Sequence, residues 1–163
     1  MSKYPEALYS EILPNLFQGG TEDEDVIHYA QNSNARRTDL PFDTVITMYA
    51  WARPADWDVQ EFRYGVPDAS ISRIDLGRLR QAVDFGYIQW KSGDRVLVRC
   101  QAGLNRSGLV TALILIKDGH SPEDAISLIR NNRGEDALFN ESFVNWLITS
   151  AANFISPPSA KSA

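Results

Sequence analysis

The sequence predicts an α/β fold in which a mainly parallel central sheet of four to five strands has helices on both faces. Short apolar, β-branched runs alternate along the chain with longer segments whose apolar residues recur every three or four positions, as expected for helices covering a parallel sheet. The chain has 163 residues, of which 44% are hydrophobic, so it can bury the core of one domain unaided. We expect a single domain over 1–155 and a disordered tail over the small, polar, Pro-containing stretch 156–163.

Five short segments have the character of strands. The first two are Leu8–Leu13, where apolar and polar residues alternate, and Leu16–Gln18; a Pro-Asn pair between them predicts a tight turn. The β-branched run within 42–48 predicts a core strand, and 61–64 is a short strand candidate before a glycine. The fifth strand, over 95–98, leads directly into the most informative loop of the chain.

Capping residues and apolar periodicity predict the helices. A threonine before four acidic residues is typical of a capped start, so we expect a helix over 22–30. Further helices are expected after Asp75, Ser121 and Asn140, and the run Leu109–Ile116 is apolar on every side, which predicts a central buried helix. The positions expected on buried faces are Leu76, Leu79, Val83, Tyr87 and Trp90, then Ala125, Ile126 and Ile129, and finally Phe143, Trp146, Leu147 and Ile148.

Composition excludes several kinds of site and partner. Cys100 is the only cysteine, which rules out an internal disulfide and a multi-cysteine metal site. His28 and His120 lack the spacing of metal ligands, and we expect both at the surface. The net charge of −5 argues against a nucleic-acid scaffold. Because no stretch approaches the roughly 18 apolar residues of a membrane span, we expect a cytoplasmic protein without a membrane partner.

The stretch VLVRCQAGLNRSGLVTALILI, residues 96–116, is the segment around which the rest of the chain is organised. We interpret it as a strand, a tight loop and a buried helix. Cys100 and Arg106 bracket the loop, so a thiol and a guanidinium can face one small anion. The loop residues between them are Gln101, Ala102, Gly103, Leu104 and Asn105.

This loop has the features of a phosphate site that contains a nucleophile. A loop that runs into a helix N-terminus directs backbone N–H groups and the positive end of the helix dipole toward one point. Gly103 permits the required backbone conformations, and Arg106 can offer two parallel donors to phosphoryl oxygens. The same field favours a thiolate, so Cys100 can attack phosphorus to form a cysteinyl-phosphate. Ser107 can then donate a hydrogen bond to the departing thiolate.

Such a reaction also needs a general acid, which afterwards serves as the base for water. The stretch VPDASISRID contains two candidates, Asp68 and Asp75. Asp75 also has the position of an N-cap for the helix that follows, so Asp68 is the preferred acid.

The stretch RCQAGLNRSG resembles the Cys-x5-Arg-Ser/Thr signature of cysteine-dependent protein tyrosine phosphatases, and the compact dual-specificity-type branch fits best. ILPNLFQGG resembles the opening strand pair of that branch, and RNNRGEDALFNESF resembles its closing helices. The resemblance implies that Cys100 is the nucleophile, Arg106 the phosphate ligand, Ser107 the hydroxyl assistant and Asp68 the general acid. It implies no metal or organic cofactor, and a phosphorylated protein as the substrate.

One residue departs from the family pattern. The family usually has histidine before the cysteine, where it helps to order the loop, whereas this chain has Arg99. Alternation along a strand directs Arg99 away from the side of Cys100, so we expect it either to be solvated or to bond loop carbonyls, with activity retained.

Three other functions stay open. An asparagine before the signature arginine, here Asn105, also resembles the RNA 5′-triphosphatase branch of the superfamily. A phosphoinositide phosphatase of the same superfamily and a phosphate-binding module without turnover are the other two. We expect substrate choice to depend on the rim of the site, formed by Arg36, Arg37, Trp51, Arg53 and the Asp68 loop.

Overall fold

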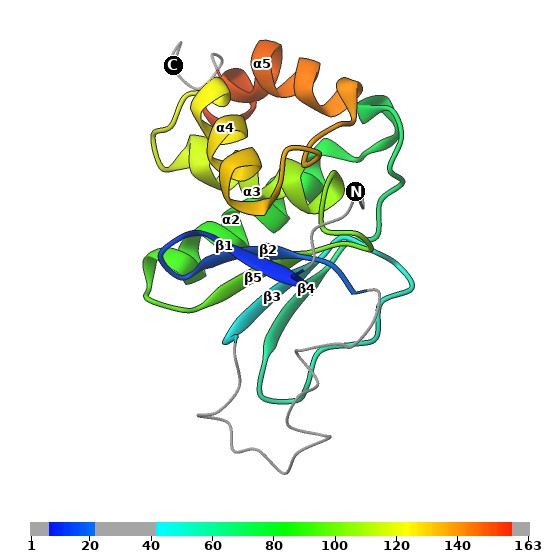
Figure 1. The fold of residues 1–163 in the computed structure, drawn as a ribbon, viewed down its shortest axis with the longest axis vertical. Coiled ribbons are helices and arrows are strands. Elements are labelled where there is room, and N and C mark those ends of the chain that lie inside the picture. Colours follow the sequence, from blue (N-terminus) through cyan, green and yellow to red (C-terminus); the bar gives the residue numbers. More distant parts are fainter. Residues whose placement is uncertain (1–6, 22–41, 158–163) are drawn as a thin grey trace.

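The computed structural model describes residues 7–21 and 42–157. Five strands form one sheet in the order β1-β2-β5-β3-β4 (Figure 1). The first pair is antiparallel, and the pairs β2·β5, β5·β3 and β3·β4 are parallel, which confirms the predicted mainly parallel sheet. The strand bounds are β1 (Tyr9–Leu13), β2 (Leu16–Gly19), β3 (Thr44–Thr47), β4 (Gln60–Arg63) and β5 (Val96–Arg99).

In the described part of the chain, four α-helices lie on one side of this sheet (Figure 1). They are α2 (Leu76–Lys91), α3 (Arg106–Lys117), α4 (Pro122–Arg133) and α5 (Glu141–Ile155), and a short 3-10 helix, η3 (Ile71–Arg73), precedes them. The predicted caps Asp75, Ser121 and Asn140 each accept a hydrogen bond from a backbone N–H in the first turn of their helix. Within the described ranges, no helix is long and apolar enough to span a membrane.

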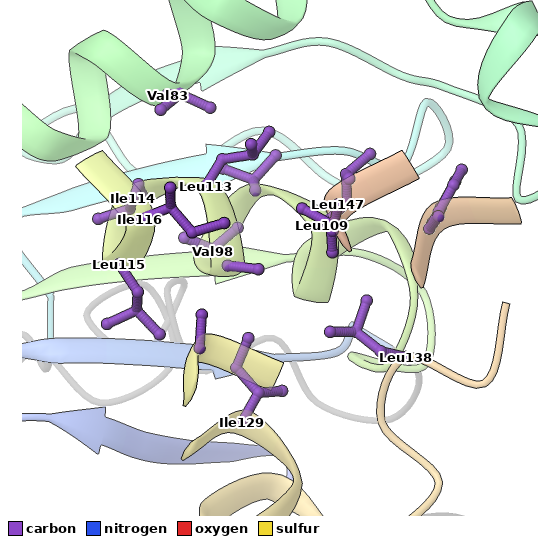
Figure 2. Packing of buried hydrophobic residues seen from close by; sticks show 14 of the residues in the cluster. Val83, Val98, Leu109, Leu113, Ile114, Leu115, Ile116, Ile129, Leu138 and Leu147 are labelled. Carbon is purple, nitrogen blue, oxygen red and sulfur yellow. The ribbon is translucent and has the colours of Figure 1, made fainter. Parts of the chain in front are cut away.

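Helix α3 lies at the centre of the helical layer because it is apolar on every side. All ten residues from 107 to 116 are buried, and α2, α4 and α5 each contact this helix. Figure 2 shows Leu109, Leu113 and Leu115 of α3 pointing in different directions into the surrounding core. This burial holds the start of α3 firmly at the end of β5, where the candidate site lies.

Several predictions fall on residues outside the described ranges. These are the helix over 22–30, the arginines at 36 and 37, the histidine at 28 and residues 158–163 of the tail. The helices of the described part lie on one face of the sheet (Figure 1), so the predicted helical cover of the second face is not seen among the described residues.

Two predicted core positions are wrong. Leu76 is 39% exposed and Ile148 is 46% exposed. In α2 the buried stripe is Leu79, Ala82, Val83 and Gly86, which places Leu76 at its edge. In α5 the stripe continues from Phe143 and Leu147 to Ala151 and Phe154, so Ile148 projects to one side. The apolar runs were correct, but both stripes include small residues, Ala82 and Gly86 in α2 and Ala151 in α5, which a count of large side chains overlooks.

The second face of the sheet is covered by irregular chain in its described part. Because β3 and β4 are parallel, the connection over 48–59 must run back from the carboxyl end of β3 to the amino end of β4. An apolar cluster occupies part of this face and contains Phe17, Phe42, Val45, Val59 and Leu97. Toward the carboxyl ends of the strands the cover becomes polar, around Arg99.

Candidate active site

The loop over 100–105 joins the carboxyl end of β5 to the start of α3, at the edge where parallel sheets place their ligand sites. Gly103 has φ of +75°, in the left-handed region that side chains disfavour. A Cβ there would lie 2.5 Å from the Gly19 carbonyl carbon, so the loop packs closely against the end of β2. Gln18 of β2 supports it further, because its Nε2 donates to the Gly103 carbonyl at 3.1 Å.

Three of the predicted catalytic residues meet at one pocket of about 210 Å³. Cys100 is buried, with 2% of its surface exposed, and faces this pocket together with Arg106 and Asp68. The pocket also reveals Phe139, an aromatic residue that is 60% exposed and that the sequence analysis did not single out. The residues lining the pocket are Asp68, Cys100, Gln101, Ala102, Leu104, Asn105, Arg106 and Phe139.

The guanidinium of Arg106 is fixed in place while part of it stays available. Its Nη1 donates to the Val66 carbonyl at 3.2 Å, and its Cζ lies 5.2 Å from the centre of the Tyr49 ring. Its Nε is buried and has no hydrogen-bond partner among the described residues. A buried N–H without a partner is costly, so this donor favours an acceptor in the pocket, such as a phosphoryl oxygen.

Ser107 lies directly beside the candidate nucleophile. Its Oγ is 3.2 Å from the sulfur of Cys100, and both side chains are buried. The hydroxyl is therefore placed to donate to an ionised sulfur.

The structure separates the two candidate acids. Asp68 lines the pocket, and its carboxylate accepts hydrogen bonds from Asn105 Nδ2 at 3.0 Å and from Asn140 Nδ2 at 2.8 Å. Asp75 instead caps α2, where its Oδ1 accepts from the Gly77 N–H at 2.9 Å. This arrangement favours Asp68 as the acid.

Arg133 is a buried residue beside the loop that the sequence analysis missed. Its Nε donates to the Gly103 carbonyl at 3.1 Å, and its Nη2 donates to the Ala102 carbonyl at 3.3 Å. In a trans peptide the N–H points opposite to the C=O, so the N–H groups of Gly103 and Leu104 point away from Arg133. This arginine thereby sets the orientation of two loop peptides.

The charge of Arg133 is held in an unusual environment. Its Nη1 donates to the Ala7 carbonyl at 2.8 Å and to Ser10 Oγ at 3.1 Å, so it also ties the loop to the region of β1. Burial lowers the pKa of Arg133 to about 10, while the negative charge of an ionised Cys100 acts in the opposite direction. The only sequence feature that marks Arg133 is its place as a basic residue in the last turn of α4. Basic residues are common at that end of helices, so this feature does not single it out.

Arg99 is fully buried, so the expectation that it is solvated is wrong; it does bond a loop carbonyl, but one in the 48–59 connection and not in the phosphate loop. Its Nη2 donates to the Arg53 carbonyl at 2.6 Å and forms an ion pair with Glu61 at 3.1 Å. Its Nε donates to Thr47 Oγ1 at 2.9 Å. As predicted, it points to the face opposite α3, because Val96 and Val98 belong to the helix-covered core while Leu97 does not.

The ion pair has a clear electrostatic consequence for Glu61. Burial, the largest single influence, opposes ionisation of this carboxyl. Hydrogen bonds from Thr47 and the Ala55 N–H, together with Arg63 and Arg99, outweigh burial and lower the pKa of Glu61 below its ordinary value of 4.5. The polar network therefore holds an ionised carboxylate under the 48–59 connection.

The pocket lining does not support the two other rim residues that the structure describes, Trp51 and Arg53. Trp51 is 84% exposed, and neither it nor Arg53 is among the residues that line the pocket.

His120, expected at the surface, is half-buried, with Nδ1 3.0 Å from the Leu115 carbonyl. In the described part of the chain, no group of three or more His, Cys, Asp or Glu side chains is arranged to hold a metal ion.

Comparison with known proteins assigns this chain to a family. The family model "Dual specificity phosphatase, catalytic domain" matches residues 28–153. A search of curated proteins gave no match.

Solved structures share the fold over most of the chain. A mouse putative dual specificity phosphatase complexed with zinc tungstate is 21% identical, with a TM-score of 0.69 over 90% of this chain and 88% of that one. Human DUSP28 is 19% identical, with a TM-score of 0.70 over 90% and 94% of the two chains. PTPMT1 in complex with PI(5)P is 22% identical, with a TM-score of 0.69 over 96% and 100%. At these identities the likeness shows the fold.

Proposed function

The chain belongs to the dual-specificity phosphatase catalytic-domain family, and we propose that it hydrolyses phosphomonoesters on phosphoproteins through a cysteinyl-phosphate intermediate. Phosphotyrosine is the proposed substrate, with phosphoserine and phosphothreonine as further ones. The observation that carries the proposal is the meeting of Asp68 with Cys100 and Arg106 at one pocket, although Asp68 comes from a segment more than 30 residues before the phosphate loop.

In the first step the phosphate dianion binds against the loop N–H groups, the N-terminus of α3 and the guanidinium of Arg106. The thiolate of Cys100 attacks phosphorus, and the bond from phosphorus to the ester oxygen breaks. Asp68 gives its proton to that oxygen, so the alcohol or phenol leaves neutral. The bonds from Arg106 strengthen as charge spreads over the equatorial oxygens in the transition state.

In the second step a water attacks phosphorus and the bond between phosphorus and sulfur breaks. The carboxylate of Asp68 takes a proton from the water, which restores the acid and forms inorganic phosphate. The Ser107 hydroxyl, 3.2 Å from the sulfur of Cys100, donates to the departing thiolate. Each residue thus ends the cycle in its starting protonation state.

The shape of the pocket supports an aryl phosphate. Ala102, Leu104 and Phe139 provide apolar surface among the lining residues, and the exposed ring of Phe139 is available to contact a flat substrate ring. Because the sulfur of Cys100 is buried, a phosphorylated side chain must extend inward to reach it. A tyrosine side chain extends further from the backbone than serine or threonine, so phosphotyrosine fits best.

The test is release of inorganic phosphate from p-nitrophenyl phosphate and from phosphotyrosyl, phosphoseryl and phosphothreonyl peptides. We expect turnover of the aryl ester and of the phosphotyrosyl peptide, abolished in Cys100→Ser. Absence of turnover at every mildly acidic and neutral pH, with tight binding of phosphate, would instead support a binding module without catalysis.

A phosphoinositide phosphatase is the second candidate, because the structure of PTPMT1 in complex with PI(5)P matches 96% of this chain. The same assay on short-chain phosphoinositides separates the two, since a phosphoinositide preferred over every phosphopeptide would favour the second. For an RNA 5′-triphosphatase the sequence argument was Asn105, and this side chain is already engaged by Asp68 and the Asn140 N–H.

A further inference from the structure

We propose that Asn105 and Asn140 are positioning residues that hold the carboxyl group of Asp68 at the pocket before substrate binds. This inference rests on the proposed function, because it concerns the residue assigned there as the general acid. It adds a role for two neutral amides from distant parts of the chain.

The three side chains form a closed set of hydrogen bonds. Asn105 Nδ2 donates to Asp68 Oδ2 at 3.0 Å, and Asn140 Nδ2 donates to Asp68 Oδ1 at 2.8 Å. The set is closed by the Asn140 N–H, which donates to Asn105 Oδ1 at 2.9 Å. Both oxygens of the carboxylate are therefore held, and its position is tied to two other segments.

The side chain of Asn105 is committed to this contact. It occupies the N-cap position of α3, where asparagine usually accepts a hydrogen bond from the first turn, yet its side chain makes no such bond. Its backbone is in the right-handed helical region, with φ of −96° and ψ of −60°, and only 2% of the residue is exposed. The side-chain amide of Asn105 therefore bonds Asp68 instead of capping α3.

Asn140 links the acid to the start of α5. Its Oδ1 caps the helix by accepting from the Phe143 N–H at 3.2 Å, which leaves its amide nitrogen free to act as a donor. That nitrogen donates to the Ala69 carbonyl at 3.0 Å as well as to Asp68. One side chain therefore serves as helix cap and as anchor for the segment that carries the acid.

This arrangement suits a group that must gain and lose a proton in each cycle. A carboxylate has about four lone-pair sites, and the two amides use one on each oxygen, so the others stay available to the leaving group and to water. The two amide donors carry no charge of their own. A displacement of about 1 Å at a reacting group can cost on the order of 100-fold in rate, so removal of an anchor should be visible in turnover.

The effect should depend on the leaving group in kcat/KM, which reports formation of the cysteinyl-phosphate, because in that step Asp68 gives a proton to the leaving oxygen. Asn105→Ala should lower turnover of phenyl phosphate, whose leaving group needs a proton, by about 10- to 100-fold. Turnover of p-nitrophenyl phosphate, whose leaving group is stable as an anion, should change much less. Asn140→Ser should act in the same direction, because serine keeps the helix cap but cannot supply the amide donor.

Asn132→Ala is the matched control, because Asn132 is exposed and its Nδ2 bonds only to the Leu128 carbonyl of its own helix among the described residues. This substitution should leave the turnover of both substrates unchanged. Thermal unfolding of every variant separates lost positioning from lost folding, and the ratio of the two substrates is independent of the fraction that is folded.

The decisive comparison uses Asp68→Asn alone and with Asn105→Ala. If the asparagine acts through the acid, the double variant loses no more activity on phenyl phosphate than Asp68→Asn does. Additive losses, or equal losses on the two substrates in Asn105→Ala, would overturn the inference. If Asp68→Asn itself shows no leaving-group dependence, the assignment of the acid has failed, and with it the proposal.

Discussion

Two arginines are buried beside the phosphate loop, one on each face of the sheet, and their partners differ. Arg99 lies on the face away from the helices, where Glu61 balances its charge. Arg133 lies on the helix side, and its described hydrogen-bond partners are three carbonyl oxygens and one hydroxyl. The same residue type therefore serves two purposes: Arg99 stabilises a polar part of the fold, and Arg133 brings charge and orientation to the site.

The difference follows from what each guanidinium touches. Arg99 bonds the carbonyl of Arg53 and so holds the irregular 48–59 connection to the sheet. Arg133 bonds the carbonyls of Ala102 and Gly103 in the phosphate loop itself. We therefore expect substitutions of Arg99 to act mainly on stability and substitutions of Arg133 mainly on catalysis.

The largest expected effect is on stability, from Arg99→Met. This change removes one of the two arginines that pair with the half-buried carboxylate of Glu61 and leaves the Arg53 carbonyl and Thr47 without their donor, which typically costs about 1–3 kcal/mol. The free energy of unfolding in denaturant measures it. A loss below about 1 kcal/mol would show that the network does not hold this face together.

A double substitution sharpens this test. Arg99→Met with Glu61→Leu removes both charges, and replacing a buried ion pair by apolar residues is often neutral. The double variant should recover at least roughly half of the loss. No recovery would assign the loss to the hydrogen bonds with Thr47 and the Arg53 carbonyl instead.

The next effect is on catalysis, from Arg133→Met. Without the guanidinium the loop carbonyls lose their donor and the orientation of their peptides relaxes, so kcat/KM for p-nitrophenyl phosphate should fall by about 10- to 100-fold. Arg133→Lys keeps the charge but not the planar fork, and should fall between wild type and Arg133→Met. If Arg99→Met lowered kcat/KM per folded molecule more than Arg133→Met, the division of roles would be wrong.

The smallest effect is the contribution of Glu61 to the pH dependence of the unfolding free energy. Its pKa in the folded protein is lower than its ordinary value of 4.5, so the stability from its ionised form is complete above that value. It is lost as the pH falls through 4.5 toward the lower folded value. The difference in unfolding free energy between wild type and Glu61→Gln should therefore shrink as the solution becomes acidic. A difference that stays constant with pH would contradict the ionised pair.

The same two faces show what the sequence could predict. The strand, loop and helix around Cys100 were correct because apolar runs, a glycine and the helix start are local signals. The caps Asp75, Ser121 and Asn140 were correct for the same reason. Ser107 beside Cys100 follows from their places on one loop and helix start.

The features that could not be predicted from the sequence depend on contacts between distant segments of the chain. Arg99 at the end of β5 is paired with Glu61 of β4, two strands across the sheet and 38 residues away in the chain. Arg133 reaches the loop from 30 residues beyond it. Phe139 follows α4 and lines the pocket only once α4 and α5 have packed on α3. Neither periodicity nor composition contains these pairings.

The central claim is that Cys100 is the nucleophile of a phosphatase, and acid-quenched turnover of a phosphotyrosyl peptide with radiolabelled phosphate tests it most directly. We expect protein-bound label on a peptide containing Cys100, no label in Cys100→Ser, and loss of phosphate release in that variant. Undiminished phosphate release by Cys100→Ser, or label on another residue, would contradict the account.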